Sequence, residues 1–584
     1  MRCLAAAVAA VAVLVPCGRA AAATYYVSPN GSDGNAGTSQ SSPWRTVAKV
    51  NRAGLQPGDT VLFAGGQTFS DAYLGPPASG TAGAPITFGS YGSGQARLTK
   101  GIWFASKSYL TFDGLTVDAG SPSADVPGLQ SSASGTGSTH IVIQNCTFQD
   151  VRLGLLISNA GDAYWTVSNN LIQSTGDSGV LIEDPNAVNG EGGHDLTFTG
   201  NSILDTGLDK SITYGKHGIY ARSANDVFRG NVIRGFSDDG ISLRFRSAVV
   251  EGNDISQGPI GIGWFQYDRS AGTSRIAYNR ISRTTTAGIY VNGYEAETGL
   301  ATQESFVIAD NTISAAGGAG IGIEKTSGSV VLANDLVTGS LSAPDLYVTG
   351  PVGGGLTHDH NLFWNDAGLT TFGGLATTAG PAEKTADPQL DANLAPTAGS
   401  PAVDAGTTAV AGLPAYAATC DGALFAYCGS APDVGARETG AGAGASPTPV
   451  APPIVQLTAT PPATTTATTA TFSWSTTTSV STVLCSLDGR PGVPCSSPTT
   501  YTGLARGSHS FRVTVSNAYG AATAGYDWSI TRAKKSAVSP TRLFAAATAR
   551  HTLSRATLRL RRAERRIKLR RAAAAVRRAV IRVR

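Results

Sequence analysis

Ionisable and aromatic side chains gather between residues 183 and 292 of this sequence. Five of them supply the chemistry of bases, acids and cations: Lys216, His217, Tyr220, Arg222 and Arg244. Elimination beside a carboxylate needs a cation to neutralise the carboxylate, a base to take the neighbouring proton and an acid to protonate the leaving oxygen. Arg222 and Arg244 are the expected cations. Lys216 or His217 is the expected base, and Tyr220 is the expected acid.

The same stretch offers carboxylates, an amide and further rings that suit substrate binding: Glu183, Asp238, Asp239, Phe265, Tyr290 and Asn292. Aromatic ring faces stack on the C–H surfaces of sugars, and Arg side chains hold carboxylates or hydroxyls. A second mechanism is open as well, because hydrolysis of a glycosidic bond uses two flanking carboxylates. Glu183, Asp238 and Asp239 are the candidates for that role.

Two interpretations without catalysis are also open for these residues. Arg222 with Glu183, and Arg244 with Asp239, could form ordinary surface ion pairs across adjacent strands. Asp238 and Asp239 could bind calcium through oxygen ligands, although Asp next to Gly is typical of a turn. We therefore expect no metal site and no cofactor, with calcium as the alternative.

These residues come together only if the chain is built from repeated coils. A motif of Asn, any residue and an apolar residue recurs at Asn170, Asn201, Asn231, Asn253, Asn279, Asn311, Asn334 and Asn361, with a variant at Asn145. From Asn170 onward, successive motifs are 22 to 32 residues apart, and the longer intervals indicate loop insertions. Asn suits the corners of stacked coils because it tolerates the left-handed conformation and its amide can bond to the Asn of the next coil.

A Gly before alternating apolar residues follows most of these motifs at a nearly constant distance. Aligning the coils on this Gly predicts columns of outward residues about 4.8 Å apart along the coil axis. The position two beyond the Gly holds Leu156, Leu181, Tyr220, Ser242, Gly263, Tyr290 and Gly322. The position four beyond it holds Ser158, Glu183, Arg222, Arg244, Phe265, Asn292 and Glu324. His217 and Asp239 precede the Gly in neighbouring coils, so we expect all of these residues on one face.

The sequence resembles the secreted, pectate-lyase-like right-handed β-helix proteins of bacteria over about residues 24–438. The resemblance rests on the Asn coils and on residues 25–38 (YYVSPNGSDGNAGT), 57–61 (PGDTV), 83–88 (GAPITF) and 399–406 (GSPAVDAG). It implies an all-β fold, a right-handed parallel β-helix built as a single-stranded solenoid. It also implies a polysaccharide as partner, without choosing among lyases, hydrolases, epimerases and relatives with no known reaction.

Composition divides the chain further. Residues 1–23 have the apolar run and small residues of a signal peptide, which predicts a secreted, extracellular protein. Residues 24–439 are the expected β-helix, with a short helix over Trp44–Ala53 as its N-terminal cap. A linker follows at 440–453, and residues 454–532 resemble an immunoglobulin-like β-sandwich. Residues 533–584 form a basic tail, helical or disordered.

Charge and cysteines limit the alternatives. Residues 550–584 carry 14 Lys and Arg against Glu564, so the rest of the chain has a formal charge of about −9. Two local disulfides are expected in an oxidising compartment, Cys420 with Cys428 and Cys485 with Cys495. Zinc is disfavoured because the sequence has no CxxC pair. Cys146 is the expected buried thiol.

The sequence therefore predicts a secreted, carbohydrate-active protein. The leading hypothesis is a polysaccharide lyase-like enzyme acting on an acidic extracellular polysaccharide. The first alternative is a non-catalytic glycan-binding or cell-envelope protein, and the second is a glycoside hydrolase. We expect a monomer whose basic tail could contact an anionic cell envelope, and no nucleic acid as partner.

Overall fold

The structure is a computed structural model of the chain. It describes residues 22–532 except 188–189, 214, 267–269, 294–302, 366–370, 377, 420–422, 440–454, 463, 477–479, 481, 489, 491 and 518–519. The basic tail, the linker, Cys420 and nearly all of the predicted signal peptide lie outside the described residues. Among the described residues, no helix is long and apolar enough to cross a bilayer.

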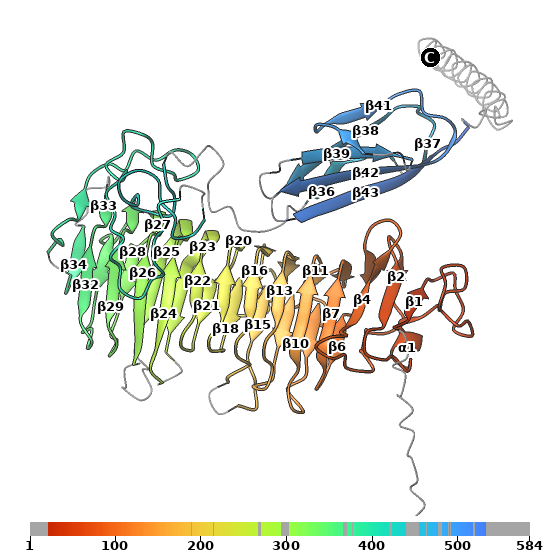
Figure 1. Ribbon diagram of the computed structural model, residues 1–584, viewed down its shortest axis with the longest axis horizontal. Coiled ribbons are helices and arrows are strands. Elements are labelled where there is room, and N and C mark those ends of the chain that lie inside the picture. The colour runs from red at the N-terminus through yellow and green to blue at the C-terminus, as the bar shows by residue number, and fades with distance from the viewer. Residues whose placement is uncertain are drawn as a thin grey trace, which may run out of the picture. The chain divides into compact units, whose positions relative to one another are not determined.

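The strands between residues 24 and 385 stack in parallel, coil upon coil, as a β-helix (Figure 1). One side of the coils is a 13-stranded sheet, called sheet A here. Its strands are β1 (Thr24–Val27), β2 (Thr60–Ala64), β4 (Ile86–Tyr91), β7 (Ser108–Asp113), β10 (Thr139–Gln144), β13 (Thr166–Ser168), β16 (Thr197–Thr199), β19 (Val227–Arg229), β22 (Val249–Glu251), β24 (Gly272–Ala277), β26 (Glu304–Ala309), β29 (Val330–Ala333) and β32 (Leu356–Asp359).

A 22-stranded sheet supplies the other sides and consists of two rows. The first row contains β3 (Thr68–Phe69), β5 (Ala96–Leu98), β8 (Leu115–Asp118), β11 (Thr147–Val151), β14 (Leu171–Thr175), β17 (Ser202–Leu204), β20 (Val232–Arg234), β23 (Asp254–Phe265), β25 (Arg280–Asn292), β27 (Thr312–Ala316), β30 (Leu336–Thr338), β33 (Leu362–Trp364) and β35 (Lys384–Thr385). The second row contains β6 (Ile102–Phe104), β9 (Leu129–Ser131), β12 (Leu155–Ile157), β15 (Val180–Ile182), β18 (Ile219–Ala221), β21 (Asp239–Leu243), β28 (Ala319–Ile323), β31 (Leu346–Val348) and β34 (Phe372–Gly374). The long strands β23 and β25 run through both rows and join them. The predicted parallel β-helix is thus confirmed.

Buried Asn side chains tie successive coils together between sheet A and the first row. The side-chain amide of Asn201 donates to Asn231 Oδ1 at 3.0 Å and to the Val167 carbonyl at 2.9 Å. The backbone N–H of Asn201 donates to the same Asn231 Oδ1 at 2.9 Å. The same three bonds recur at Asn170, Asn231, Asn253, Asn279 and Asn311. This asparagine ladder satisfies buried backbone groups that a bare corner would leave unpaired.

The structure corrects the sequence interpretation of two motifs by one residue. The left-handed residue of each corner precedes the ladder residue, and Asn145 and Asn334 take that place with φ of 54° and 57°. Cys146 and Asp335 therefore stand in the ladder: Cys146 N–H donates to Asn170 Oδ1, and Asp335 Oδ1 accepts from Asn311. Asn suits both the left-handed corner position and the ladder position that follows it, because a short amide side chain can hydrogen-bond to the backbone in either place. The motif alone therefore could not tell the two positions apart.

The recurrent Gly has a steric cause. A Cβ built at Gly218 would lie 2.5 Å from the Gly240 carbonyl oxygen and 2.5 Å from a methyl carbon of Ile233. Gly240 meets the Gly261 carbonyl and Ile255 in the same way, at 2.6 Å each. Only Gly lets consecutive coils approach this closely at the start of the second row.

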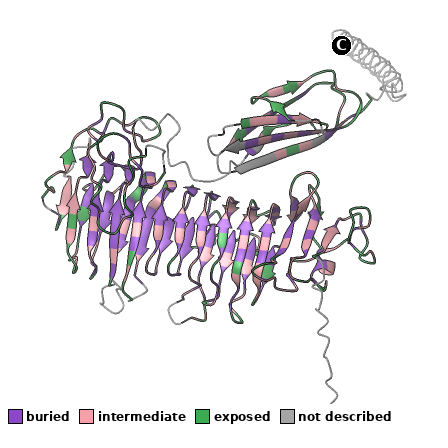
Figure 2. Ribbon diagram, viewed as in Figure 1, coloured by how far each residue is buried: buried purple, intermediate pink, exposed green. Residues whose placement is uncertain are grey.

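Inward side chains form one continuous apolar column, seen as the buried band along the strands in Figure 2. Phe198 and Phe228 stack at 5.4 Å between adjacent coils, which is typical of the column. Cys146 belongs to it, and burial raises the pKa of this thiol to about 12. That result agrees with the predicted core thiol.

The N-terminal end of the column is covered by the short helix α1 (Val47–Val50), within the segment predicted to be helical. Thr46 caps the helix by accepting the Lys49 N–H, and Val47 and Val50 are buried. Residues 386–439 contain no strand among their described residues and pack against the last coils through apolar clusters such as Leu336, Leu362, Ala402 and Val434.

The residues after 454 form a separate set of strands. A three-stranded sheet contains β36 (Val455–Ala459), β38 (Ala470–Thr476) and β41 (Thr499–Tyr501). A five-stranded sheet contains β37 (Thr464–Thr465), β39 (Thr482–Leu487), β40 (Val493–Pro494), β42 (Gly507–Asn517) and β43 (Gly520–Ile530). Phe472 and Phe511 stack at 4.0 Å between the two sheets. The predicted disulfide Cys485–Cys495 is present, and Cys428 is disulfide-bonded. The immunoglobulin-like assignment stays a prediction.

Candidate functional site

The strand registers of the second row align the outward residues as the alignment on the recurrent Gly predicts. Consecutive partners are Leu156, Leu181, Tyr220, Ser242, Gly263, Tyr290 and Gly322. Phe265 and Asn292 are partners in the second predicted column. The chemistry-bearing residues of the middle coils therefore share the outward face of the second row.

His217 precedes β18, and its side chain is only 3% exposed. Its Nδ1 accepts the backbone N–H of Asp239 at 3.2 Å, so the proton of the neutral ring is on Nε2. Burial, and then the nearby Arg244, lowers the pKa of His217 to about 3. Nε2 lies 3.8 Å from Asp238 Oδ2. His217 is thus a neutral ring whose remaining N–H lies next to the Asp238 carboxylate.

The adjacent residues Asp238 and Asp239 differ in environment. The Asp239 side chain is 2% exposed, and its Oδ2 accepts the Ser242 hydroxyl at 2.5 Å. Burial is the largest cause that raises the pKa of Asp239 to about 7. The Asp238 side chain is 45% exposed, and partial burial raises its pKa while Arg244 opposes the shift. Asp238 is therefore the carboxylate that a bound ligand can reach, whereas Asp239 keeps its proton to near neutrality.

Two guanidinium groups from consecutive coils lie against the ring of Tyr220. Arg222 Nε donates to the Tyr220 hydroxyl oxygen at 2.8 Å. The guanidinium carbon of Arg244 lies 4.9 Å from the Tyr220 ring centroid and 4.3 Å from that of Phe265. The Tyr220 ring also stacks on His217 at 4.9 Å. Cation–π contacts of this kind fix the orientation of an arginine that would otherwise have many rotamers.

The other predicted site residues lie around this centre with other partners. Glu183 Oε2 is 3.7 Å from Arg222, which matches the ion-pair interpretation of these two residues. Lys216 Nζ donates to the Asp209 carbonyl at 2.9 Å, away from the rings. Burial, and then Glu324, raises the pKa of Tyr290. Tyr290 packs on Phe265 at 5.7 Å, and Asn292 is the register partner of Phe265.

Sequence reasoning placed Ser242 and Glu324 in the outward columns but gave them no role. Ser242 donates to the buried Asp239, and Glu324 accepts from Tyr290. The register that named their columns was the available signal. It could not reveal these hydrogen bonds, because each one runs between different columns.

One possible ligand atom from each of His217, Asp238 and Asp239 lies within 4.8 Å of the others, so we asked whether the three residues could bind a metal ion. Calcium prefers oxygen ligands in larger number, and a metal-binding imidazole needs a free nitrogen lone pair. Here Nδ1 of His217 accepts a backbone N–H, and the guanidinium of Arg244 interacts electrostatically with all three residues. The donor set does not fit a cation in this arrangement.

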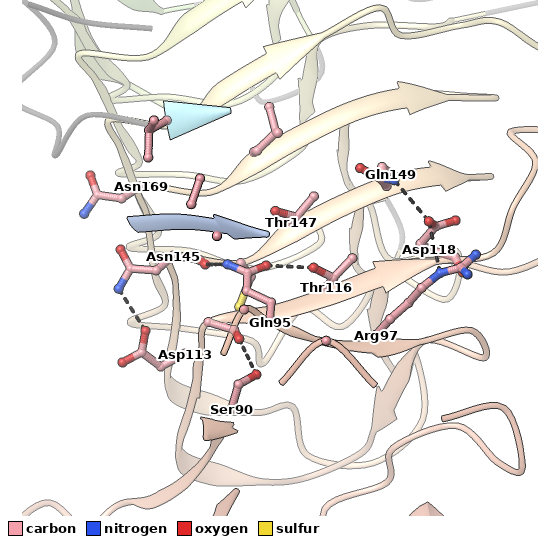
Figure 3. A pocket seen from close by; sticks show the side chains of 18 of the residues that line it. Ser90, Gln95, Arg97, Asp113, Thr116, Asp118, Asn145, Thr147, Gln149 and Asn169 are labelled. Carbon is pink, nitrogen blue, oxygen red and sulfur yellow. Dashed lines mark hydrogen bonds and ion pairs between the residues drawn. The ribbon is translucent and has the colours of Figure 1, made fainter. Parts of the chain in front are cut away.

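A second polar surface lies on the outward face of the first row (Figure 3). Arg97 Nε is 3.1 Å from Asp118 Oδ2, and the Gln149 amide donates to the same oxygen at 3.0 Å. Thr116 donates to Gln95 at 2.7 Å. Because these side chains hydrogen-bond or ion-pair with one another, we interpret this surface as structural.

Comparison with known proteins identifies the same architecture. Residues 186–352, which contain most of the predicted site, match the family described as "Right handed beta helix region". Together with the parallel registers, this match establishes a right-handed parallel β-helix. Over 73 residues the chain is 49% identical to a lacto-N-biosidase of Bifidobacterium longum subsp. longum. That segment is 12% of this chain and 5% of the biosidase, so the match spans a small fraction of that relative.

Solved structures with related shapes share little sequence with this chain. Pectate lyase Pel9A is 18% identical, with a TM-score of 0.40 over 72% of this chain and 97% of the lyase. A GH136 lacto-N-biosidase from Eubacterium ramulus is 16% identical, with a TM-score of 0.36 over 62% of this chain and 67% of the biosidase. The A-module of the mannuronan C-5 epimerase AlgE6 of Azotobacter vinelandii is 15% identical, with a TM-score of 0.39 over 59% of this chain and 94% of the module.

Proposed function

We propose that this protein binds an acidic extracellular polysaccharide across the outward face of the second row and cleaves it by β-elimination. One observation carries the proposal. Arg222 and Arg244 are held on the ring of Tyr220, and the half-exposed carboxylate of Asp238 lies at the same centre through its contact with His217. Cations, a carboxylate and a phenol are the groups that elimination next to a uronate carboxyl requires.

The guanidinium groups bind and neutralise the uronate carboxylate. Arg244 is held between Tyr220 and Phe265, so its planar fork is preorganised for a bidentate contact. Neutralising the carboxylate acidifies the proton on the adjacent ring carbon, C5, because the charge that develops there on removal of the proton is delocalised into the carboxyl group.

Asp238 is the base that the geometry favours. Lys216 Nζ is held at the Asp209 carbonyl, and His217 uses its Nδ1 lone pair to accept the Asp239 N–H, so neither is placed to take a proton from the substrate. Asp238 takes the C5 proton, the C4–C5 double bond forms, and the bond from C4 to the glycosidic oxygen breaks. Tyr220 gives its hydroxyl proton to that oxygen, since the hydroxyl oxygen already accepts from Arg222. His217 then acts as a positioning residue that holds Asp238 through Nε2.

Hydrolysis is the second candidate, and one observation favours it. A carboxyl group that is protonated near neutrality, Asp239, and an accessible carboxylate, Asp238, lie within 4.8 Å of each other. Two carboxyl groups with separated pKa values are the requirement for an acid and a nucleophile or base in glycoside hydrolysis. The greater burial of Asp239, 2% exposed against 9% for Tyr220, counts against this candidate because the acid must reach the leaving oxygen.

The decisive experiment incubates the full chain with pectate, alginate and glycosaminoglycans. Ultraviolet absorbance from unsaturated uronate ends supports elimination, and new reducing ends without that absorbance support hydrolysis. Asp238→Asn, Tyr220→Phe and Arg244→Met should each lower the rate at least about a hundredfold, the usual effect of losing one acid–base or charge-stabilising group. Arg234→Met is the matched control, because Arg234 is an exposed arginine of the first row paired with Asp254. Binding of these polymers without any product would refute the enzymatic proposal and support the glycan-binding alternative.

A further inference from the structure

Two exposed aromatic rings lie at the N-terminal end of the column that contains Tyr220. Trp103 is 40% exposed and Tyr73 is 47% exposed, and their ring centroids are 5.8 Å apart at 79°. Trp103 is the register partner of Gln130, and Gln130 is the partner of Leu156. The rings therefore belong to the same outward face as the candidate site.

The exposed rings are fixed by a rigid backbone. Trp103 stands between the buried residues Ile102 and Phe104 of β6. The Tyr73 carbonyl accepts the Asn51 amide at 2.7 Å, and the adjacent Leu74 is fully buried. Rings that stay exposed on a fixed backbone lose little conformational entropy when a ligand covers them.

Glycines next to the rings make room for them to lie against the sheet. A Cβ at Gly75 would come within 3.0 Å of a Tyr73 ring carbon. At the candidate site, a Cβ at Gly263 would lie 2.5 Å from a Phe265 ring carbon, and one at Gly322 would lie 2.9 Å from Tyr290. A glycine beside an aromatic residue therefore lets the ring lie against the sheet both at Tyr73 and at the candidate site.

The two rings border a hollow of about 330 Å³ that is also lined by Lys100, Ile102, Pro127 and Gln130. Lys100 is exposed, so its ammonium group can meet a carboxylate, and the Gln130 amide can bond to hydroxyls. Apolar ring faces beside one cation and one amide match the two sides of a uronic-acid residue.

The distance to the candidate site follows from the registers. Trp103, Gln130, Leu156, Leu181 and Tyr220 are consecutive partners, which makes four strand steps. At about 4.8 Å for each step, Trp103 and Tyr220 are about 19 Å apart along the coil axis, so only a chain of several sugar residues reaches both.

We infer that Tyr73, Trp103 and Lys100 form a remote subsite that binds the same acidic polysaccharide several sugar residues from the point of cleavage. The inference rests on the proposed function for the identity of the ligand. It makes the protein selective for long chains, because only a chain that reaches from Tyr220 to Trp103 gains both sets of contacts.

The test measures binding apart from cleavage. Asp238→Asn protein is titrated with uronic-acid oligosaccharides of three and of eight residues, alone and combined with Trp103→Ala, Tyr73→Ala or Lys100→Met. Each ring variant should weaken binding of the longer oligosaccharide about tenfold and leave that of the shorter one unchanged. Lys100→Met should reduce the preference for acidic over neutral chains. Tyr164→Ala is the matched control, because Tyr164 is 52% exposed, belongs to no strand of the second row and packs on His140 and His194.

The outcomes separate the two proposals. Binding of the longer oligosaccharide that depends on Trp103, in a wild-type protein that releases no product, would support the subsite and refute β-elimination. Cleavage with unchanged affinity in the Trp103→Ala and Tyr73→Ala variants would refute the subsite and leave β-elimination standing. Equal losses for the short and the long oligosaccharide, or no binding of any acidic chain, would also overturn the inference.

Discussion

Replacing Asp335 with Asn is expected to stabilise the β-helix, and by more at high pH than at low pH. Asp335 stands in the asparagine ladder, where its Oδ1 accepts the backbone N–H and the side-chain amide of Asn311 at 2.9 Å each. Its Oδ2 is buried without a hydrogen-bond partner among the described residues. An Asn keeps the acceptor and adds an amide within reach of Asn361 Oδ1 and the Ile308 carbonyl, as at the other ladder positions.

The magnitude follows from the pKa. Burial, and to a smaller extent Glu383, raises the pKa of Asp335 from 3.8 to about 7. Because the folded pKa is the higher one, the contribution of this group to stability is complete below pH 3.8 and is lost as the pH rises through about 7. At about 1.4 kcal/mol for each pKa unit, the ionised side chain costs on the order of 4 kcal/mol at about pH 8. Near pH 4 the substitution should gain only about 1 kcal/mol from added hydrogen bonds.

Urea unfolding followed by circular dichroism at both pH values measures this difference. The Asp335→Asn midpoint should rise at both pH values and clearly more at the higher one, with an unchanged slope. Asn279→Asp is the reciprocal control, because it places a carboxyl in an Asn position of the same ladder and should lower the midpoint mainly at high pH. An equal shift at both pH values, or a lower midpoint for Asp335→Asn at high pH, would refute the reasoning.

Three further changes test the fold and the site. Asn231→Ala should cost about 3 kcal/mol or more of unfolding free energy, because it leaves the buried donors of Asn201 unpaired; a denaturant midpoint within error of wild type would contradict the ladder. Gly263→Ala should weaken polysaccharide binding several-fold, since its Cβ would lie 2.5 Å from a Phe265 ring carbon and 3.0 Å from Asp239 Oδ2; unchanged affinity would show that the substrate does not depend on the position of that ring. The elimination rate should fall as the pH drops through the raised pKa of Asp238, because only the ionised carboxylate accepts a proton; a rate profile without this acid limb would exclude Asp238 as the base.

The sequence was sufficient to predict the stacking of coils and the face on which the candidate residues lie. The spacing of Asn and Gly predicts registers such as Tyr220 with Ser242. It does so because each coil needs a hydrogen-bonding Asn at one corner and a Gly where it packs closely on the next coil. The same spacing assigned Asn334 to the ladder, whereas Asn334 is the left-handed corner residue that precedes it. The two positions are adjacent in the chain, and Asn suits both.

Hydrogen-bond direction and burial lie beyond such patterns. Nothing in the spacing indicates that His217 is buried with Nδ1 occupied, whereas Asp238, one coil later, is half-exposed. Trp103 was missed for another reason. It lies in coils that precede the first Asn motif, so the alignment on Asn and Gly never reached it.

The asparagine ladder keeps the rise per coil the same whatever the number of residues in the coil. Asn231 bonds to Asn253 across 22 residues at 2.9 Å, and Asn279 bonds to Asn311 across 32 residues at the same 2.9 Å. The rise from one coil to the next therefore does not depend on how many residues the coil contains. Loops between the strands can therefore be lengthened, shortened or exchanged while the spacing of the arginines and rings on the outward face of the second row stays fixed, so one scaffold can acquire new loops one at a time.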